Sequence, residues 1–312
     1  MTSPVVISRT DVAQLLDWPT VLKATRTGLL VAGSPPTGSA VSAQVLYESG
    51  SLHLKAATLN KEKIISVKSN LRPNRGGVSG VLLAYDLETE QLSGIIDAGL
   101  MTAWRTGAIA AVAAERLVEP RPTKVAILGV GPVGQQCASG ILRMLNVVEM
   151  RFWSHHADRS KAVAQEFSDR VTVRACEDAS EAVSGVDLIV TATPASEPIL
   201  TDQVLQPGVV ILAMGADTAG KRELALHITS QSLVIADVPT DALRVGESAY
   251  LSRERGKLVT PLSLWLTSAV QPDRDDSPLV FDSVGSSHVD AAVTAVIMAR
   301  ASADGRGHQL QW

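Results

Sequence analysis

The sequence predicts an α/β protein that contains two different kinds of sheet. Between about residues 42 and 97, short apolar strands follow one another with only turns between them, which is typical of an antiparallel sheet. From residue 124 onward, strands alternate with helices, which indicates a parallel sheet with right-handed crossovers. A glycine turn separates the first strand from the first helix of this second part. The 312 residues are enough for two hydrophobic cores.

The first part is expected to begin with helix and to continue as strands. In the first thirty residues, Ser8 or Thr10 can cap a helix from Asp11, and Pro19 suits a first helical position. Strands are predicted over residues 43–47, 51–56, 64–69, 80–86 and 92–97. An Ala-rich helix over 102–117 ends at Glu119-Pro120-Arg121-Pro122, which marks a domain boundary.

The second part follows a strand–helix rhythm. Strands are predicted over residues 124–128, 148–153, 171–174, 188–191, 209–214 and 233–236. Helices are predicted over residues 135–145, 160–167 and, near the end of the chain, 290–301. The tail from Asp304 is expected to be frayed.

Composition excludes several classes of protein. Apolar residues make up 46% of the chain and the net charge is −4, so neither disorder nor binding to nucleic acid or an anionic membrane is expected. Two cysteines cannot form a disulfide framework. The N-terminus lacks the pattern of a signal peptide, and no apolar run approaches the roughly 20 residues that span a bilayer. We therefore expect a cytoplasmic protein.

The glycine turn has the pattern and the context of a dinucleotide-binding site. It reads Gly129-Val130-Gly131-Pro132-Val133-Gly134, follows an apolar strand and opens a helix. The first glycine permits the tight turn, the second lets a pyrophosphate approach the backbone, and the third lets helix and strand pack closely. The phosphates would meet free N–H groups at the positive end of the helix. The alternative is an ordinary strand–helix turn.

The end of the second strand indicates which nicotinamide cofactor would bind. NAD sites usually place a carboxylate there, whereas this strand ends in Trp153 and is followed by Ser154 and His155. Ser154, His155 and Arg159 could hold a 2′-phosphate, which favours NADP, while Asp158 keeps NAD open. No Cys or third ligand lies near the adjacent histidines, so we expect no metal site.

Three basic residues lie in apolar surroundings before residue 120. Lys55 and Lys68 fall in predicted strands, and Arg105 falls in the Ala-rich helix. Such a charge either reaches water or meets an anion, and three together suggest a clamp for a carboxylate. In the second part, the strand from Val209 runs into Gly215-Ala216-Asp217, at the edge where parallel sheets bind ligands. Asp217 is either an acid/base group or a helix N-cap.

At these segments the chain resembles the ornithine cyclodeaminase/mu-crystallin family. The most specific similarities are Leu100-Met101-Thr102-Ala103-Trp104-Arg105-Thr106-Gly107-Ala108 and Gly215-Ala216-Asp217 with Gly220-Lys221-Arg222-Glu223-Leu224. Others are Thr191-Ala192-Thr193-Pro194 and Phe281-Asp282-Ser283-Val284-Gly285. The resemblance covers nearly the whole chain.

The resemblance implies a homodimer and an NAD(P)-dependent reaction at the α-carbon of an amino or imino acid. It implies a substrate-binding and dimerisation domain over 1–118, rejoined by a C-terminal helix over 288–312, and a Rossmann NAD(P)-binding domain over 119–287. Lys68 and Arg105, together with Lys55, would hold the substrate carboxylate, and Asp217 and Lys68 would be catalytic. The cofactor would be lined by Thr106, Gly129, Gly131, Pro132, Val133, Gly134, Thr191, Thr193, Met214, Lys221 and Ser283, besides Ser154, His155 and Arg159.

Three activities remain open within this resemblance. The first is an amino-acid dehydrogenase or imine reductase, and the second is a cyclodeaminase that releases ammonia with catalytic NAD. The third is a cofactor-binding protein without turnover. Ornithine cyclodeaminases of the family have an acid near Lys55, which meets the side-chain amine of ornithine, and a lysine there would repel that amine. Lys55 therefore favours the first activity.

Overall fold

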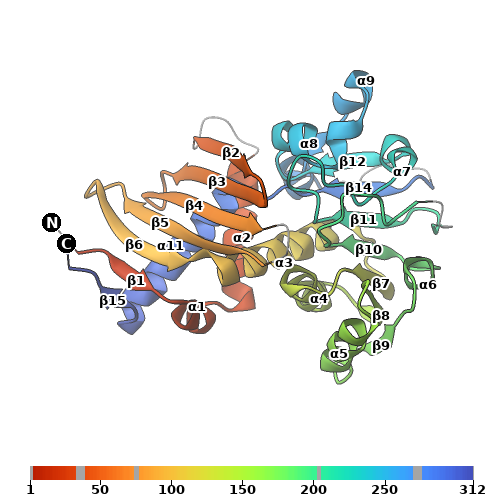
Figure 1. Cartoon of the computed structure of the whole chain (residues 1–312), viewed down its shortest axis with the longest axis horizontal. Helices are drawn as coiled ribbons and strands as arrows, with labels where there is room; N and C mark the ends of the chain where they lie inside the picture. Colours follow the sequence, from red (N-terminus) through yellow and green to blue (C-terminus); the bar gives the residue numbers. More distant parts are fainter. Residues whose placement is uncertain (1–2, 33–38, 74–76, 202–204, 270–275, 312) are drawn as a thin grey trace. The chain divides into compact units, whose positions relative to one another are not determined.

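The computed structural model describes residues 3–32, 39–73, 77–201, 205–269 and 276–311. The chain divides into two compact units, Met1–Arg105 with Ser286–Trp312 (unit 1) and Thr106–Gly285 (unit 2). Unit 1 holds a mostly antiparallel sheet and unit 2 a parallel one, which confirms the predicted fold class (Figure 1).

The division between the units falls inside helix α3 (Ala98–Leu117) and not after residue 118. The first turns of α3 bind to unit 1, because Thr102 accepts a hydrogen bond from Asn70 and Arg105 pairs with Asp290. Just beyond, Gly107 lies so close to the backbone of Gln136 in unit 2 that a Cβ would be only 2.5 Å from it. One helix therefore serves both units.

Seven strands form the sheet of unit 1, in the order β15-β1-β6-β5-β4-β3-β2. Their bounds are β1 Val5–Ile7, β2 Ala40–Tyr47, β3 Gly50–Leu59, β4 Ile64–Pro73, β5 Ser79–Asp86, β6 Gln91–Asp97 and β15 His308–Gln309. Neighbouring strands are antiparallel except β1 and β6, which are parallel. The tail expected to be frayed instead pairs with β1, so that prediction was wrong.

Helices α1 (Arg9–Leu15), α2 (Trp18–Ala32) and α11 (Ser287–Asp304) complete unit 1. Ser8 caps α1 in a reciprocal arrangement with Asp11, as one of the two predicted caps. Helix α11 packs against α2, β3 and β4. Gly28 of α2 makes this close approach possible, since a Cβ there would lie 2.6 Å from Cα of Val289.

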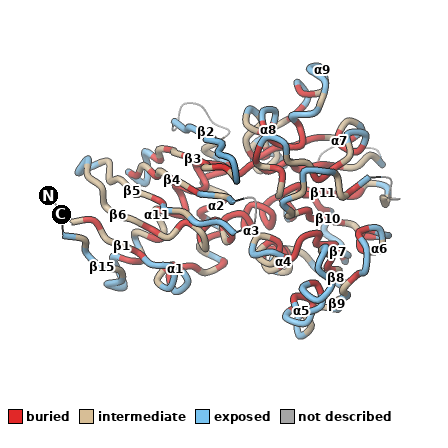
Figure 2. Tube along the Cα trace, viewed as in Figure 1, coloured by how far each residue is buried: buried red, intermediate tan, exposed pale blue. Residues whose placement is uncertain are grey.

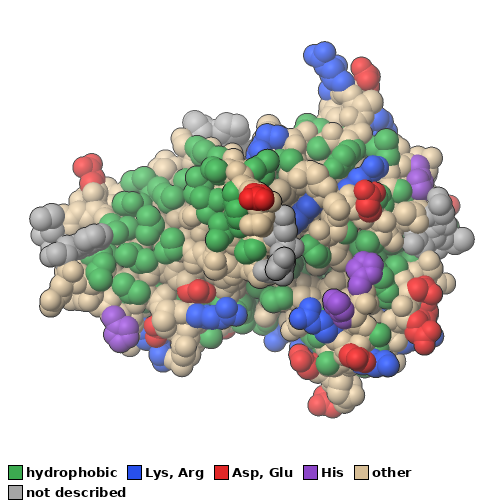
Figure 3. Space-filling model, viewed as in Figure 1, with side chains coloured by type: hydrophobic (Ala, Val, Ile, Leu, Met, Phe, Trp, Pro, Cys, Tyr) green, Lys and Arg blue, Asp and Glu red, His purple; other side chains and the backbone are tan. Residues whose placement is uncertain are grey.

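The face of the unit 1 sheet that α11 covers is rich in polar residues, and the opposite face is apolar. The face covered by α11 carries buried polar residues, among them Lys55 on β3 and its direct partner Lys68 on β4. The opposite face carries an apolar row across five strands, in which Val41, Ala56, Val67, Leu83 and Ile95 are successive partners. Strand β2 is exposed along most of its length (Figure 2). Figure 3 shows hydrophobic side chains gathered over this sheet.

Eight strands form the sheet of unit 2, in the order β13-β12-β14-β11-β10-β7-β8-β9, and all neighbours are parallel. Their bounds are β7 Thr123–Leu128, β8 Val147–Trp153, β9 Thr172–Ala175, β10 Leu188–Thr191, β11 Val210–Ala213, β12 Leu233–Ala236, β13 Thr260–Pro261 and β14 Leu279–Asp282. Strands β10, β11 and β14 are buried on both faces and almost wholly apolar. The chain leaves β7 for β8 on one side and later returns to β10 on the other, which makes a topological switch point between β7 and β10.

Short helices surround the sheet of unit 2. Their bounds are α4 Pro132–Met144, α5 Ala157–Phe167, α6 Ala179–Val183, α7 Leu226–Gln231, α8 Pro239–Val245, η1 Glu247–Tyr250, α9 Arg253–Gly256 and α10 Leu262–Thr267. None of the helices in the described parts of the chain is long and apolar enough to cross a membrane.

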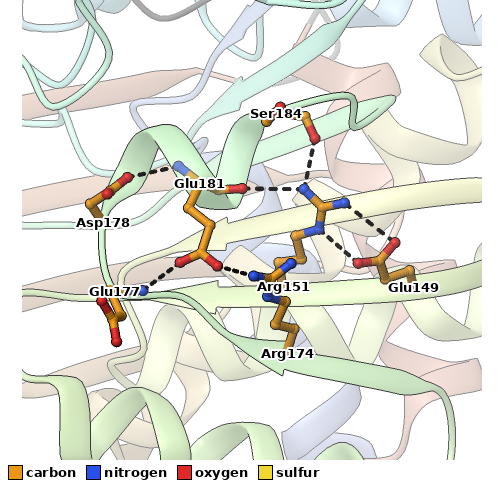
Figure 4. Close-up of polar contacts among 7 residues, drawn as sticks. All are labelled: Glu149, Arg151, Arg174, Glu177, Asp178, Glu181 and Ser184. Carbon is orange, nitrogen blue, oxygen red and sulfur yellow. Dashed lines mark hydrogen bonds and ion pairs between the residues drawn. The ribbon is translucent and has the colours of Figure 1, made fainter.

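A polar cluster holds α6 against strands β8 and β9 (Figure 4). Arg151 on β8 pairs with Glu149 and donates to the carbonyl oxygens of Glu181 and Ser184, at the end of α6, at 3.2 and 2.7 Å. Asp178 caps the start of the helix, and Arg174 on β9 pairs with Glu181. This cluster explains why so short a helix is ordered, and it belongs to the scaffold.

Candidate active site

Four of the predicted cofactor residues lie at the carboxyl edge of the unit 2 sheet. Gly129 follows β7, Thr191 ends β10, Met214 follows β11 and Ser283 follows β14. The pairing register aligns Leu128, Thr191, Ala213 and Asp282 across these four strands. The residues are therefore brought together beside the switch point, where open α/β sheets bind their ligands.

The glycine turn has the geometry that a dinucleotide phosphate needs. Gly129 has φ +104°, and a side chain there would overlap the carbonyl group of Ala192. A Cβ at Gly134 would overlap the carbonyl oxygen of Gly129, so only glycine permits this helix–strand contact. At Gly131, by contrast, a Cβ would meet no atom within 4 Å. The backbone of Gly131 therefore has open space beside it, which the close approach of a phosphate requires.

Helix α4 begins without a side-chain cap. Gly131 is its N-cap and offers no side chain, and Pro132 occupies the first turn. The N–H groups of Val133 and Gly134 in this first turn have no intrahelical acceptor and lie at the positive end of the helix. Gln135 donates to the carbonyl oxygen of Val130 at 3.0 Å and fixes the turn. The turn therefore fits a dinucleotide, and Pro132 and Val133 are the first two residues of α4.

The residues after β8 have mixed roles. The hydroxyl of Ser154 lies 3.0 Å from both the carbonyl oxygen of His156 and the hydroxyl of Ser160, so it helps to form the turn into α5. His155 is exposed and its ring contacts the edge of Trp153. Arg159 is exposed on the first turn of α5. No carboxylate stands between Trp153 and α5, and Asp158 lies within that helix.

The hydroxyls of Thr191 and Thr193 bind a buried carboxylate that the sequence analysis did not single out. Glu223 is fully buried and accepts from both hydroxyls at 2.7 Å. It also accepts from the backbone N–H groups of Thr193 at 2.7 Å and Gly215 at 2.9 Å. Burial raises the pKa of Glu223 above its ordinary value, although these four hydrogen bonds act in the opposite direction.

Glu223 is the first of several carboxylates in this region. Glu247 accepts from the backbone N–H of Glu223 at 2.6 Å, and burial raises the pKa of Glu247 to about 8. Asp282 accepts from the backbone of Glu247 and Ser248, and burial raises the pKa of Asp282 to about 7. Asp237 accepts from the hydroxyl of Ser283 at 2.8 Å. Buried acidic groups therefore fix the segments that follow the central strands.

Asp217 lies in a turn and not at a helix start. Helix α7 begins only at Leu226, with Ala225 as its N-cap, so the N-cap interpretation was wrong. The carboxylate of Asp217 pairs with Nζ of Lys221 at 3.1 Å, and Lys221 also lies 3.4 Å from the carbonyl oxygen of Gly215. The side chain of Asp217 is 14% exposed, which leaves it partly accessible to a ligand.

In unit 1 the predicted basic residues meet a buried acid on α11. Lys68 Nζ lies 2.6 Å from one oxygen of Asp290, and Arg105 Nε lies 2.9 Å from the other. These three side chains are 1–4% exposed. Lys55, opposite Lys68 in the register, is also buried. The structure therefore brings Lys55, Lys68 and Arg105 onto one face of the sheet.

The charges of this cluster perturb one another. Burial, with the positive charges of Arg105 and Lys55, lowers the pKa of Lys68 well below its usual value. Burial would raise the pKa of Asp290, but the charges of Arg105, Lys68 and Lys55 hold it below its ordinary value. Asn70 extends the polar surface by donating to Thr102 at 3.2 Å. Thr106, the next residue after Arg105, is buried on α3.

Two residues of the candidate site were not singled out from the sequence. Asp290 is an acid in an otherwise apolar part of an Ala-rich helix, which is the same signal that marked Arg105, and it could have been found in that way. Glu223 was quoted within a family segment, but its donors come from residues up to 32 positions away, so no local pattern reveals its role. Among the described residues, no group of His, Cys, Asp and Glu could hold a metal ion.

A parallel sheet with this turn at its switch point defines unit 2 as a dinucleotide-binding unit of the Rossmann type. The profile of the ornithine cyclodeaminase/mu-crystallin family matches residues 48–305, and the chain belongs to this family.

Named relatives and a solved structure cover most of the chain. The ketimine reductase mu-crystallin of Macropus fuliginosus is 30% identical over 69% of this chain and 67% of its own length. The L-lysine cyclodeaminase of Streptomyces rapamycinicus is 28% identical over 77% of this chain and 70% of its own. An archaeal alanine dehydrogenase, solved as a dimer with bound NAD, superposes with a TM-score of 0.91 at 21% identity and 99% coverage of both chains, which shows the shared fold.

Proposed function

We propose that this protein is an NAD(P)-dependent oxidoreductase that transfers a hydride to or from the α-carbon of an amino or imino acid. The observation that carries the proposal is the buried cluster of Lys68, Arg105 and Asp290, with Lys55 beside it. Lys68 and Arg105 are deeply buried and share the carboxylate of Asp290, and such cations are suited to bind a substrate carboxylate. The family and the glycine turn, which has open space at Gly131, support the binding of a nicotinamide cofactor.

Different residues would bind the substrate and transfer its proton. Lys68 and Arg105 would bind the substrate carboxylate, with Asp290 holding both cations in place. Asp217 would accept or donate the proton at the substrate nitrogen, and its partner Lys221 would hold the carboxylate in place. A bound nicotinamide would supply or take up the hydride.

The cofactor would be held mainly by unit 2. Val133 and Gly134 would donate backbone N–H groups to the pyrophosphate at the open side of Gly131. Thr106, Thr191, Thr193, Met214 and Ser283 would line the remainder. The absence of a carboxylate between β8 and α5 favours NADP, with Ser154, His155 and Arg159 at the 2′-phosphate.

The cofactor preference is tested by one substitution on α5. Arg159→Gln should weaken NADPH binding about tenfold and leave NADH binding within about twofold of wild type, since only NADPH carries a 2′-phosphate. Lys161→Gln, at an exposed position two residues further on, is the matched control and should change neither. Equal effects of Arg159→Gln on both cofactors would contradict the NADP assignment.

The activity is tested by incubating the protein with NADPH or NADH and a panel of cyclic imino acids, or α-keto acids with an amine. Net loss of absorbance at the nicotinamide band supports the proposal. Asp217→Asn should retain cofactor binding, measured by fluorescence, and lose turnover at least a hundredfold. Cofactor binding without turnover on any of these substrates would overturn the proposal and favour a binding protein.

A cyclodeaminase is the second candidate, because a lysine cyclodeaminase is among the relatives that cover most of the chain. It predicts release of ammonia from ornithine or lysine with catalytic NAD and no net formation of NADH. Against it, Lys55 lies within the buried basic cluster, where the side-chain amine of such a substrate would be repelled. The ammonia assay, run beside the absorbance assay, distinguishes the two activities.

We also propose that the protein is a homodimer that covers the apolar face of the unit 1 sheet. Val41 and Val45 on β2 are 63% and 53% exposed, and Leu71 and Val81 continue the surface on β4 and β5. An apolar surface that crosses several strands is typical of a protein interface. A second copy would bury the same row of residues on both partners, as a twofold axis requires.

A further inference from the structure

Glu223 joins the segments that follow two neighbouring strands of unit 2. Thr191 and Thr193 belong to the carboxyl end of β10, and Gly215 lies just after β11. All three donate hydrogen bonds to the one carboxylate. We propose that Glu223 is a positioning residue, which holds these two segments in the conformation that binds the nicotinamide cofactor. This inference rests on the function proposed above.

The carboxylate is placed as a fixed acceptor. It is 0% exposed, and none of the ion pairs among the described residues includes it. Its backbone is also held from both sides. The N–H of Glu223 donates to Glu247 at 2.6 Å, and its carbonyl oxygen accepts from Ile199 at 2.8 Å and Leu200 at 3.0 Å. Because the backbone of Glu223 is held in this way, its carboxylate has a fixed position, and the groups that donate to it are fixed as well.

The donors of Glu223 adjoin the residues proposed to contact the cofactor. The methyl group of Thr193 lies where a Cβ on Gly129 would approach it to 2.9 Å, so Thr193 borders the glycine turn. Gly215 directly follows Met214, and its carbonyl oxygen accepts from the backbone N–H of Asp217 at 3.1 Å. A displacement of the Glu223 carboxylate would therefore move both sides of the cofactor-binding edge.

Gly215 shows how tightly this arrangement is built. A Cβ on Gly215 would lie 2.6 Å from the carboxylate of Glu223, so the chain can donate its N–H there only because the residue is glycine. The contact leaves no room for a water molecule between the two groups. The segment after β11 is consequently held directly by Glu223.

The distribution of donors makes Glu223→Gln a sharp probe. Each carboxylate oxygen accepts one backbone N–H, from Thr193 on Oε1 and from Gly215 on Oε2. An amide offers only one oxygen, so either orientation of the glutamine leaves one backbone N–H facing a donor. The threonine hydroxyls can rotate to adapt, but the backbone cannot. The substitution keeps the size of the side chain and breaks only this hydrogen-bond pattern.

A matched control lies at the opposite edge of the same sheet. Asp187 precedes β10 and accepts from the backbone N–H of Lys124 at 2.8 Å, while its other oxygen pairs with Arg121. Asp187→Asn should lower the melting temperature of the protein without touching the carboxyl edge. It separates a general loss of stability from a specific loss of cofactor binding.

The experiment titrates the full-length protein with NADPH and NADH by fluorescence, well below each melting temperature. Glu223→Gln should raise the Kd of both cofactors at least tenfold, whereas Asp187→Asn should keep them within about twofold of wild type. An unchanged Kd in Glu223→Gln overturns the inference. If that variant does not fold, Thr193→Val, which removes one donor, should raise the Kd about threefold, and no change there also overturns it. Wild-type protein that binds neither cofactor would contradict the proposed function itself.

Discussion

At the residue scale, Asp290 is expected to stabilise unit 1 more than any exposed acid does. Its carboxylate pairs with two buried cations, Lys68 and Arg105. Asp290→Asn would leave both cations without their anion, which costs about 3–5 kcal/mol when one member of a buried pair is removed. In urea unfolding, this loss should appear as a lower urea concentration at the midpoint, with an unchanged dependence of the unfolding free energy on urea concentration.

The control for this prediction is Asp241→Asn. Asp241 pairs with Arg244, whose side chain is 45% exposed, and such pairs contribute less than about 1 kcal/mol. Equal losses of stability in the two variants would show that Asp290 does not have the role assigned to it. An anion bound at Lys68 and Arg105 should partly restore the stability of Asp290→Asn, because it replaces the missing charge.

Residues of this kind differ in how far the sequence reveals them. Lys68 and Arg105 stand out because a charge in an apolar strand or helix needs a partner. Glu223, Glu247 and Asp282 are held mostly by backbone N–H groups of distant segments, and a backbone donor leaves no mark in the sequence. The buried cations could therefore be recognised in the sequence, as could Asp217, whereas Glu223, Glu247 and Asp282 could not.

At the element scale, two glycines of the turn before α4 are expected to have different roles. Substitution of Gly131 should weaken cofactor binding, and substitution of Gly134 should lower the stability of the fold. Gly131 has extended backbone angles and open space around its Cβ position, so Gly131→Ala should fold with an unchanged melting temperature. The added methyl would occupy the space where the pyrophosphate approaches. We expect at least a tenfold weaker affinity for NADPH and NADH, measured by fluorescence titration.

Gly134→Ala is the companion variant in the same turn. Its methyl group would overlap the carbonyl oxygen of Gly129, so the helix and the strand must separate. This overpacking should lower the free energy of unfolding by about 1–3 kcal/mol. If Gly131→Ala were instead the less stable of the two variants, the assigned roles of the glycines would be wrong.

Other elements show where pattern reading succeeds and fails. Strands β10 and β12 have the predicted bounds, because short apolar runs between turns are unambiguous in a parallel sheet. Strands β1, β13 and β15 contain only two or three residues and carry too little pattern to be recognised. In β3, Leu52 and Leu54 face away from α11 while Lys55 is buried, so alternation alone gives the strand but the wrong buried face.

At the scale of the whole molecule, the apolar face of the unit 1 sheet should determine the oligomeric state. Val45→Lys would place a charge within the proposed interface and should convert the dimer to a monomer in sedimentation velocity. Leu258→Lys is the control, since Leu258 is 59% exposed in unit 2. A wild-type monomer, or a dimer that persists in Val45→Lys, would contradict this interface.

The buried acids of unit 2 predict how the stability of the whole molecule changes with pH. The pKa of Asp282 rises from an ordinary 3.8 to about 7, and that of Glu247 rises from 4.5 to about 8. Between about pH 5 and 7 the folded protein therefore holds protons that the unfolded chain has released. These two groups therefore lower the stability as pH rises through this window, by up to about 1.4 kcal/mol per pH unit for each group.

Asp282→Asn isolates one of these groups. The substitution also removes hydrogen bonds, so the variant should have a lower free energy of unfolding at every pH. The informative quantity is how steeply this free energy changes with pH. Urea unfolding at pH 5, 6 and 7 should show a decline that is shallower than in wild type by about 1.4 kcal/mol per pH unit. Carboxylates with lowered pKa values, such as Asp17 and Asp86, lose their contribution only in more acidic solution and do not disturb this window. If stability declines equally steeply with pH in the two proteins, Asp282 is ionised in the folded protein throughout this range, and its three hydrogen-bond donors outweigh its burial.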